Sequence, residues 1–318
     1  MSKTLFTPKD GAHHPLPPVE EVGGKGYGLY WLAVHRFPTP LTWVLSTDLF
    51  DLAVRRTGLA EASLAIGRAL AHPPADWNAL QALINDLEPH RTALVEALQQ
   101  LAEMDLVRTV LADLPGREQW AVRSSATVED DPHHSFAGQF RSFLSVPRAD
   151  LWTTICRVWA SAYGREALSY CFQKRTALPR MAVILQPMAP LTAQDRSGVA
   201  FSHSPVLSLP GVLIQVTFGS GPTVVGGHGG DLFSVAGSEV QVRPMPPDRI
   251  LVTAPQGGLE PQATPAGPAL SHDEARQLAG LVQAVADRWG RPVNVEFVWQ
   301  AGKGPLLTQV RSVATPAA

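Results

Sequence analysis

The sequence has few cysteines, little net charge and no long apolar run. Two cysteines among 318 residues argue against a disulfide framework and favour a reducing, cytoplasmic compartment. A net charge of −2 provides no overall basic field, so we expect no binding to nucleic acid. No stretch approaches the roughly 18 apolar residues of a membrane span, and residues 1–11 lack the apolar core of a signal peptide. We therefore expect no membrane association.

The remaining composition predicts a globular α+β protein with two subdomains. Apolar residues make up 45% of the chain and charged residues 17%, and a chain of this length exceeds one small core. Helical patterns dominate the first part of the chain and strand patterns the second. We therefore predict an N-terminal subdomain over 1–190 and a C-terminal subdomain over 191–318.

Apolar periodicity and turn residues predict the order of the elements. Residues 1–20 are expected to form an irregular arm, and residues 245–269, rich in proline and glycine, a long loop or lid. Ser271 and Glu274 have the spacing of a capping box at a helix start. The predicted helices are 22–36, 47–56, 59–71, one or two within 76–113, 151–173 and 271–289. The predicted strands are 41–45, 120–123, 140–146, 181–187, 198–202, 212–217, two within 231–242, 293–300 and 305–310.

Residues 23–28, Gly-Gly-Lys-Gly-Tyr-Gly, form the first candidate anion site, at the start of a predicted helix. Glycine lets the backbone approach a ligand closely, and the unpaired N–H groups of a helix start attract an anion. Lys25 would add a positive charge for phosphate. The spacing is not that of a Walker A loop, so a glycine-rich turn with a solvent-exposed lysine is the alternative interpretation.

The second candidate is the segment 121–126, together with the small residues 135–139. A strand is predicted to end at Arg123 and to enter a polar loop over 124–138. Arg123 could grip phosphate oxygens with two N–H groups, and the serine and glycine N–H groups of the loop could surround the rest of the anion. An ordinary turn with an arginine packed on the surface is the alternative.

The third candidate is a pair of strands near the end of the chain. Strand alternation places Asn294 and Glu296 on one face of the first strand, and Gln309 and Arg311 on one face of the second. If the strands pair as a hairpin, the four side chains gather in one patch. Glu296 and Gln309 offer oxygen ligands for Mg²⁺, and Arg311 could neutralise a transferring phosphoryl group. A half-exposed sheet with a structural ion pair is the alternative.

Several segments with distinctive residues follow one another along the chain. They are GGKGYGL (23–29), AVRSSATVED (121–130), SFAGQF (135–140), VWASAYGREA (158–167), SGVAFSHSP (197–205) and VEFVWQ with LLTQVRS (295–312). In this order they resemble the N-terminal nucleotide-binding domain of the pyruvate phosphate dikinase and phosphoenolpyruvate synthase family, which rifampicin phosphotransferase shares. The resemblance covers nearly the whole chain and implies an ATP-grasp-like fold that binds ATP and Mg²⁺.

The resemblance implies roles for residues in the first part of the chain. Lys25 and Arg123 match family positions that contact the phosphates of ATP, and Gly138 lies in the glycine loop that covers them. Gln186 and Met188 bound the segment that matches the strand and hinge of the adenine pocket, where backbone groups make the contacts. Lys25 and Arg123 are therefore expected to help spread the charge of the transferring phosphoryl group.

The resemblance also implies roles for the last two strands. Glu296 and Gln309 match positions that hold the metal and the nucleotide, and Arg311 matches the catalytic arginine of the family. The family usually has an aspartate at the position of Asn294, so we expect weaker binding of Mg²⁺ here. A further departure is Gly-Ser-Gly-Pro at 219–222, where the family often has Gly-Leu-Gly-Glu.

No segment of the 318 residues resembles the family's phosphohistidine motif. The resemblance therefore implies a component that passes phosphate from Mg-ATP to a histidine on a separate polypeptide. A nucleotide-binding module without turnover and a direct small-molecule kinase remain alternative hypotheses.

Overall fold

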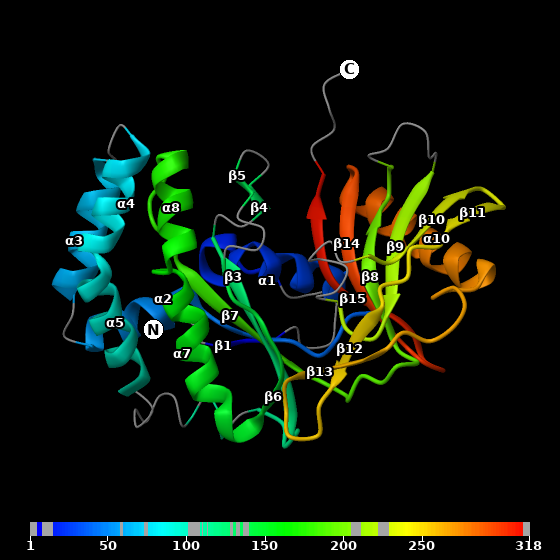
Figure 1. Ribbon diagram of the computed structural model, residues 1–318, viewed down its shortest axis with the longest axis horizontal. Coiled ribbons are helices and arrows are strands. Elements are labelled where there is room, and N and C mark those ends of the chain that lie inside the picture. Colours follow the sequence, from blue (N-terminus) through cyan, green and yellow to red (C-terminus); the bar gives the residue numbers. More distant parts are fainter. Residues whose placement is uncertain are drawn as a thin grey trace. The chain divides into compact units, whose positions relative to one another are not determined.

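The computed structural model describes most of the chain and assigns it to two compact units. The described residues are 5–7, 15–57, 60–72, 76–100, 109, 111–112, 114–127, 130–131, 134–135, 140–204, 211–221 and 229–313. Unit 1 comprises Met1–Lys9, Pro15–Tyr27 and Leu41–Met188, and unit 2 comprises Asp10–His14, Gly28–Pro40 and Ala189–Ala318. Residues 28–40, which our predicted boundary placed in the N-terminal subdomain, thus belong to unit 2. Both helices and sheets are present, which confirms an α+β protein (Figure 1).

Unit 1 is built on a five-stranded sheet with the order β1-β2-β7-β3-β6. All of its neighbouring strands are antiparallel. The central strand β7 is buried along almost its whole length because it has a neighbour on each side and helices against one face. The strands are β1 (Leu5–Phe6), β2 (Trp43–Leu45), β3 (Gln119–Ala126), β6 (Phe143–Pro147) and β7 (Met181–Pro187), with a separate small pair, β4 (Asp130–Asp131) and β5 (His134–Ser135).

Helices form the other layer of unit 1. One apolar cluster joins them to the sheet, and Trp120, Val122, Ile155, Trp159 and Leu185 are among its fully buried members. Helix α7 packs against β3, β6 and β7, and α5 packs against α7 (Figure 1). The helices are α2 (Thr47–Arg56), α3 (Ala60–Ala71), α4 (Trp77–Asp86), α5 (Glu88–Gln100), α7 (Leu151–Ser161) and α8 (Arg165–Lys174), with a short 3-10 turn, η2 (Arg148–Asp150).

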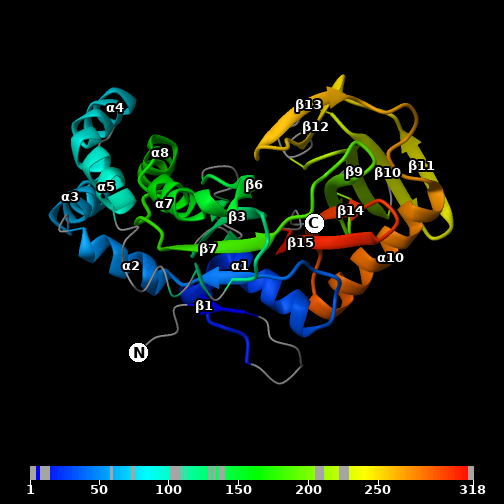
Figure 2. The same ribbon diagram turned by 90° about the horizontal axis from the view of Figure 1, so that it is seen from below.

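Unit 2 is a six-stranded antiparallel sheet with the order β11-β10-β9-β8-β14-β15. Helix α10 (His272–Trp289) packs on one face of this sheet, as Figure 2 shows. Its apolar stripe, which includes Leu278 and Val282, is fully buried. The strands are β8 (Arg196–Phe201), β9 (Val212–Phe218), β10 (Asp231–Ala236), β11 (Glu239–Arg243), β14 (Val293–Gln300) and β15 (Gly304–Ser312), with a separate hairpin of β12 (Arg249–Thr253) and β13 (Leu259–Ala263).

Helix α1 (Val19–Val34) contributes residues to both units, with Tyr27 the last residue assigned to unit 1. Its second part packs within unit 2, where the ring of Trp31 meets that of Trp289 edge-on at 4.5 Å. Gly28 lets the second part of α1 lie close to β15, because a Cβ at Gly28 would lie 2.7 Å from the carbonyl oxygen of Val310. Glycine is thus needed at Gly28 for packing against β15.

Four sequence-based expectations were wrong. The predicted arm over 1–20 contains β1 and the start of α1, and the helix predicted over 151–173 is two helices separated at residues 162–164. The predicted loop over 245–269 contains the β12–β13 hairpin. Ser124 and Ser125, predicted to begin a polar loop, continue strand β3 and are fully buried. The strands β1 and β3 and the β12–β13 hairpin gain hydrogen bonds from partner strands that local sequence patterns do not reveal, whereas α7 and α8 are divided by a local turn over 162–164.

The start of α10 tests the capping box. The Ser271 hydroxyl accepts a hydrogen bond from the Glu274 N–H, and the Glu274 carboxylate accepts one from the Ser271 N–H. Because this pair satisfies two N–H groups at the helix start, we predict that Ser271→Ala lowers the free energy of unfolding by about 1 kcal/mol. Urea unfolding monitored by circular dichroism measures the change. Ser238→Ala in the exposed β10–β11 turn is the control, and equal effects of the two substitutions would contradict the prediction.

Candidate functional site

The glycine-rich segment is a helix interrupted at Gly23, whose φ of 71° and ψ of 171° are not helical. A Cβ on Gly23 would lie 2.0 Å from the carbonyl oxygen of Ser125, so only glycine fits this close approach to β3. The preceding turn is held at the carbonyl of Glu20, which accepts hydrogen bonds from Thr47 Oγ1 at 2.6 Å and Arg180 Nη1 at 3.2 Å. The chain therefore enters the glycine-rich segment along a defined path.

The Ser125 hydroxyl closes the turn of the glycine-rich segment. It donates to the carbonyl oxygen of Val22 at 2.7 Å and accepts from the N–H of Gly26 at 2.9 Å. One hydroxyl thus satisfies a backbone acceptor and a backbone donor on either side of Gly23. We call these two bonds the Ser125 latch. It lies wholly within unit 1, as does the contact of Lys25 Nζ with Ser124 Oγ at 3.4 Å.

Arg123 lies on the same strand as the latch. Strand alternation puts Arg123 and Ser125 on one face of β3, whereas Trp120 and Val122 belong to the apolar cluster with the helices. Arg123 is half-buried and lies opposite Ile184 of β7. Lys25 thus contacts Ser124, the residue next to Arg123 on β3, although alternation points Ser124 and Arg123 to opposite faces of the strand.

Gln186 and Met188 lie at the end of β7. The Gln186 side chain is buried, and its Nε2 donates to Thr42 Oγ1 at 3.0 Å. The Met188 N–H donates to the carbonyl of Gln119 at 2.9 Å. Because the Gln186 side chain already has a protein partner, a nucleotide contact through the backbone remains the prediction for this segment. Gly138, predicted to cover the phosphates, lies outside the described residues.

In unit 2 the predicted hairpin is confirmed. Glu296 of β14 lies directly opposite Gln309 of β15, and Asn294 lies opposite Arg311, with a β-bulge just after Glu296. Directly opposite residues on antiparallel strands point to the same face of the sheet. Arg311 Nε donates to Asn294 Oδ1 at 3.1 Å. We call these four residues the polar hairpin patch.

The polar hairpin patch faces away from α10. Arg196 lies opposite Trp299 in the sheet and forms an ion pair with Glu274 of α10, so both side chains are on the helix side. Alternation along β14 then places Asn294 and Glu296 on the opposite face. Asn294 and Gln309 are buried, and Glu296 and Arg311 are half-buried. Part of this polar face is satisfied within the sheet, because Arg311 bonds Asn294.

The donor set of the patch suits Mg²⁺ in part. The carboxylate of Glu296 and the amide of Gln309 supply oxygen atoms, the ligand type that Mg²⁺ prefers. They are two residues on adjacent strands, and no group of three or more Asp, Glu, His or Cys side chains placed for a metal occurs among the described residues. Phosphate and water oxygens would have to complete the coordination shell, as is usual for Mg²⁺ beside a nucleotide.

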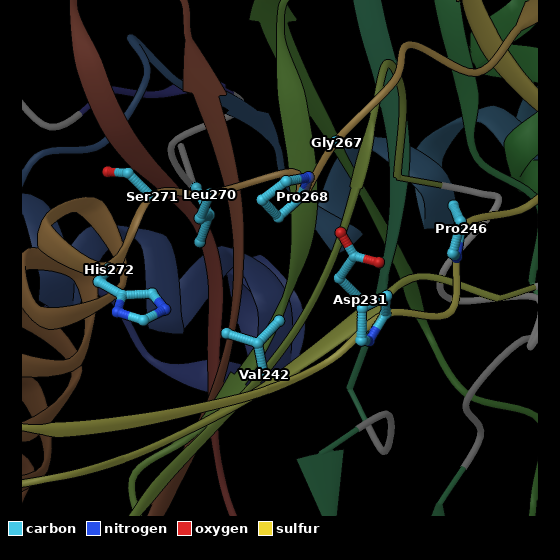
Figure 3. A pocket seen from close by; sticks show the side chains of 9 residues that line it. Asp231, Val242, Pro246, Gly267, Pro268, Leu270, Ser271 and His272 are labelled. Atoms are coloured by element: carbon cyan, nitrogen blue, oxygen red, sulfur yellow. The ribbon is translucent and has the colours of Figure 1, made fainter.

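A hollow of ≈ 380 Å³ in unit 2 contains none of the predicted site residues (Figure 3). Val242, Pro268 and Leu270 give it apolar walls, and Ser271 and His272 line it at the start of α10. The carboxylate of Asp231 is 3% exposed and accepts from the N–H groups of Met245 at 3.0 Å and Ala269 at 2.8 Å. Both carboxylate oxygens thus hold backbone segments, which assigns Asp231 a structural role.

Neither cysteine is suited to nucleophilic chemistry. Cys156 on α7 and Cys171 on α8 are buried in the apolar cluster of unit 1. Burial raises the pKa of each thiol to about 12, so the reactive thiolate is scarce near neutral pH.

In the part of the chain that the structure describes, no helix is long and apolar enough to cross a membrane.

Comparison with known proteins places these residues in a family. The family model described as "Pyruvate phosphate dikinase, AMP/ATP-binding domain" matches residues 19–317, which include both the Ser125 latch and the polar hairpin patch. The chain belongs to this family. The family resemblance seen in the sequence is therefore confirmed, and nucleotide binding is the property that the family's description names.

Relatives of the domain occur in proteins with different reactions. Phosphoenolpyruvate synthase of Aeropyrum pernix is 29% identical over 98% of this chain and 42% of its own length. Rifampicin phosphotransferase of Streptomyces sviceus is 31% identical over 88% of this chain and 32% of its own. A prodigiosin synthesizing transferase of Serratia marcescens is 26% identical over 98% of this chain and 34% of its own. The chain spans less than half the length of each of these relatives.

Two site features were missed by sequence reasoning. The latch role of Ser125 was not predicted, because the segment 124–138 was interpreted as a loop that binds the anion with its own N–H groups. Asn294 was treated only as a lost carboxylate, not as a partner of Arg311. The signal for the first was the glycine spacing, since Gly23 and Gly26 both lie against Ser125.

Gly23→Ala tests the close contact between the glycine-rich turn and β3. The added Cβ meets a backbone oxygen in a conformation that L-residues avoid, so we predict destabilisation by about 2–3 kcal/mol. Gly67→Ala in α3 is the matched control, because a Cβ added there would have no neighbouring atom within 4 Å. That substitution should stabilise by about 0.5–1 kcal/mol. Urea midpoints measure both, and shifts of the same sign would contradict the interpretation.

Proposed function

We propose that this protein binds Mg-ATP and transfers a phosphoryl group from it to an acceptor on a separate polypeptide. The observation that carries the proposal is the match of residues 19–317 to a family described by AMP/ATP binding. The names of two relatives, phosphoenolpyruvate synthase and rifampicin phosphotransferase, support a phosphate-transfer reaction of this type. Membership of the family supports this chemistry by analogy of fold, and the site residues support it by their charges and ligand types.

The proposed architecture is an ATP-grasp-like fold. An N-terminal subdomain over 1–190 would carry the phosphate-binding loops, and a C-terminal subdomain over 191–318 would carry the polar hairpin patch. We propose that each subdomain carries residues that bind the nucleotide or its metal. Support comes from the residue types on each side, with lysine and arginine in the first and a carboxylate, two amides and an arginine in the second.

In the N-terminal subdomain, Lys25 and Arg123 would bind phosphate oxygens. The Ser125 latch supports this role because it holds the turn that carries Lys25 against the strand that carries Arg123. Preorganised cations bind an anion without a further ordering cost, and the same contacts strengthen as charge develops during transfer. Gly138 would cover the phosphates, and the backbone at Gln186 and Met188 would line the adenine pocket.

In the C-terminal subdomain, Glu296 and Gln309 would hold Mg²⁺, and Arg311 would contact the transferring phosphoryl group. Bound Mg²⁺ would neutralise phosphate charge. Arg311 would offer N–H donors to phosphate oxygens in a fixed plane. In the transfer step, a bond forms between the acceptor nucleophile and phosphorus while the bond from that phosphorus to the leaving phosphate oxygen breaks. The cationic side chains stabilise the charge carried by the leaving group.

A nucleotide-binding module without turnover is the second candidate. The observation that favours it is the contact between Arg311 and Asn294. Asn294 supplies an amide there, whereas the family resemblance predicts a carboxylate at this position. Fewer carboxylates lower the affinity for Mg²⁺. Both candidates require nucleotide binding, and only the first requires transfer.

Binding is tested by thermal unfolding with and without Mg-ATP. Nucleotide at 100 times its Kd should stabilise the wild-type protein by about 2.7 kcal/mol. Lys25→Ala and Arg311→Ala each remove a charged hydrogen-bond donor, so we expect affinity to fall by about 10-fold to 100-fold. Lys303→Ala, in the exposed turn between β14 and β15, is the control and should leave affinity unchanged. Absence of any wild-type shift would refute both candidates.

Transfer is tested with ATP radiolabelled separately at the β- and γ-phosphates. The protein is incubated with Mg-ATP and, in turn, with each histidine-containing protein that a neighbouring gene encodes. Label on that second protein is measured after acid treatment and after alkali treatment, because phosphohistidine is lost in acid and retained in alkali. Label that requires Arg311 supports the phosphotransfer proposal. Nucleotide binding that saturates without label on any partner would favour the module without turnover.

A further inference from the structure

Asn294 links three neighbouring strands through its side-chain amide. Its Oδ1 accepts from Arg311 Nε of β15 at 3.1 Å, and its Nδ2 donates to the carbonyl oxygen of Ala200 on β8 at 3.3 Å. Asn294 is 4% exposed, and its contact with Ala200 is buried whereas its contact with Arg311 is partly buried. Buried polar groups of this kind are held in place by their partners.

The chemistry of the two partners determines the orientation of the amide. The Nε–H of Arg311 can only donate, and the carbonyl of Ala200 can only accept. An amide supplies one acceptor and one donor, and so satisfies both partners at once. An ionised aspartate would satisfy Arg311 but would place a second acceptor against the carbonyl of Ala200. The site is therefore suited to asparagine rather than to aspartate.

We propose that Asn294 is a positioning residue that fixes the guanidinium of Arg311 for the nucleotide phosphates, and that it is not a ligand of Mg²⁺. This inference rests on the proposed function. The amide of Asn294 uses the Nε–H, which is one of the five N–H donors of arginine. The two terminal nitrogens remain available for an end-on bidentate contact with phosphate. Restraining the long side chain of Arg311 before the nucleotide arrives removes an ordering cost from binding.

Asparagine at position 294, where the family usually has aspartate, therefore has a different role from a missing metal ligand. From the resemblance alone, asparagine represents a lost carboxylate and weakened metal binding. In the structure, the Asn294 oxygen is directed to Arg311, whereas Glu296 and Gln309 form the neighbouring cross-strand pair. Metal binding and arginine positioning are thus assigned to adjacent pairs on the same face of the hairpin.

A double-mutant cycle on Mg-ATP affinity tests the positioning role. Asn294→Leu keeps the approximate volume and removes both hydrogen bonds, and we expect it to weaken Mg-ATP binding about 10-fold in the wild-type background. In the Arg311→Ala background it should change affinity by less than about 2-fold, because the group that it positions is absent. Additive effects in the two backgrounds would overturn the proposal.

The Mg²⁺ dependence separates positioning from metal ligation. With ATP held constant, Asn294→Leu should leave the half-saturating Mg²⁺ concentration unchanged, whereas Glu296→Gln should raise it. Asn294→Asp should not tighten Mg²⁺ binding, and it provides a second variant if the leucine substitution fails to fold. A lower half-saturating Mg²⁺ concentration for Asn294→Asp would overturn the proposal, since it would make this position a metal site.

Two further measurements distinguish failure of this proposal from failure of the proposed function. The Arg311 Nε–H signal in a ¹⁵N–¹H spectrum, assigned by its loss in Arg311→Lys, should exchange with solvent at least about 10-fold faster in Asn294→Leu. An unchanged exchange rate overturns the positioning role even if Mg-ATP binds. Absence of Mg-ATP binding by the wild-type protein instead overturns the proposed function, and the positioning role with it.

The control is another amide–arginine pair outside the candidate site. Asn85 Oδ1 on α4 accepts from Arg165 Nη2 at 2.8 Å in an exposed contact within unit 1. Asn85→Leu removes that pair and should leave both the affinity for Mg-ATP and the Mg²⁺ dependence unchanged. Equal losses in Asn85→Leu and Asn294→Leu would attribute the effect to general destabilisation and would overturn the proposal.

Discussion

The first part of the candidate site depends on the two hydrogen bonds made by the hydroxyl of Ser125. It bonds a carbonyl before Gly23 and an N–H after it, and so holds a non-helical turn inside an otherwise helical segment. The turn requires glycine because the backbone of β3 passes too close for a Cβ. Lys25 lies within this restrained turn. The backbone position of Lys25 is therefore fixed by the hydrogen bonds of this turn, and only the lysine side chain keeps its rotational freedom.

A second polar side chain has a corresponding role in unit 2. The amide of Asn294 restrains Arg311 while it bonds a neighbouring strand, much as Ser125 restrains the turn that carries Lys25. In both places a small buried polar residue satisfies one donor and one acceptor. Cations held in this way suit the binding of a charged phosphate, since the ordering cost is met during folding. Within each unit, a buried polar side chain thus restrains the cation that we propose for phosphate binding.

Local sequence patterns predicted several elements with little error, for identifiable reasons. The segments 47–56 and 181–187 match α2 and β7 in their bounds, because apolar periodicity and flanking turn residues agreed there. The β10–β11 hairpin corresponds to the two strands predicted within 231–242. The β12–β13 hairpin was missed because its prolines and glycines dominated the local pattern. Helices α7 and α8 were merged because both have apolar faces and only residues 162–164 separate them.

The sequence by itself determined the family, the α+β class and the residue types of the candidate site, including the placement of Asn294 and Glu296 on one face of a strand and of Gln309 and Arg311 on one face of the next. These follow from motif order and from strand alternation, which are local properties of the chain. Only the tertiary structure decided that Ser124 and Ser125 are strand residues, that Ser125 closes the turn at Gly23, and that Asn294 bonds Ala200. Such contacts join residues about 100 positions apart, and their geometry depends on packing that no short segment encodes.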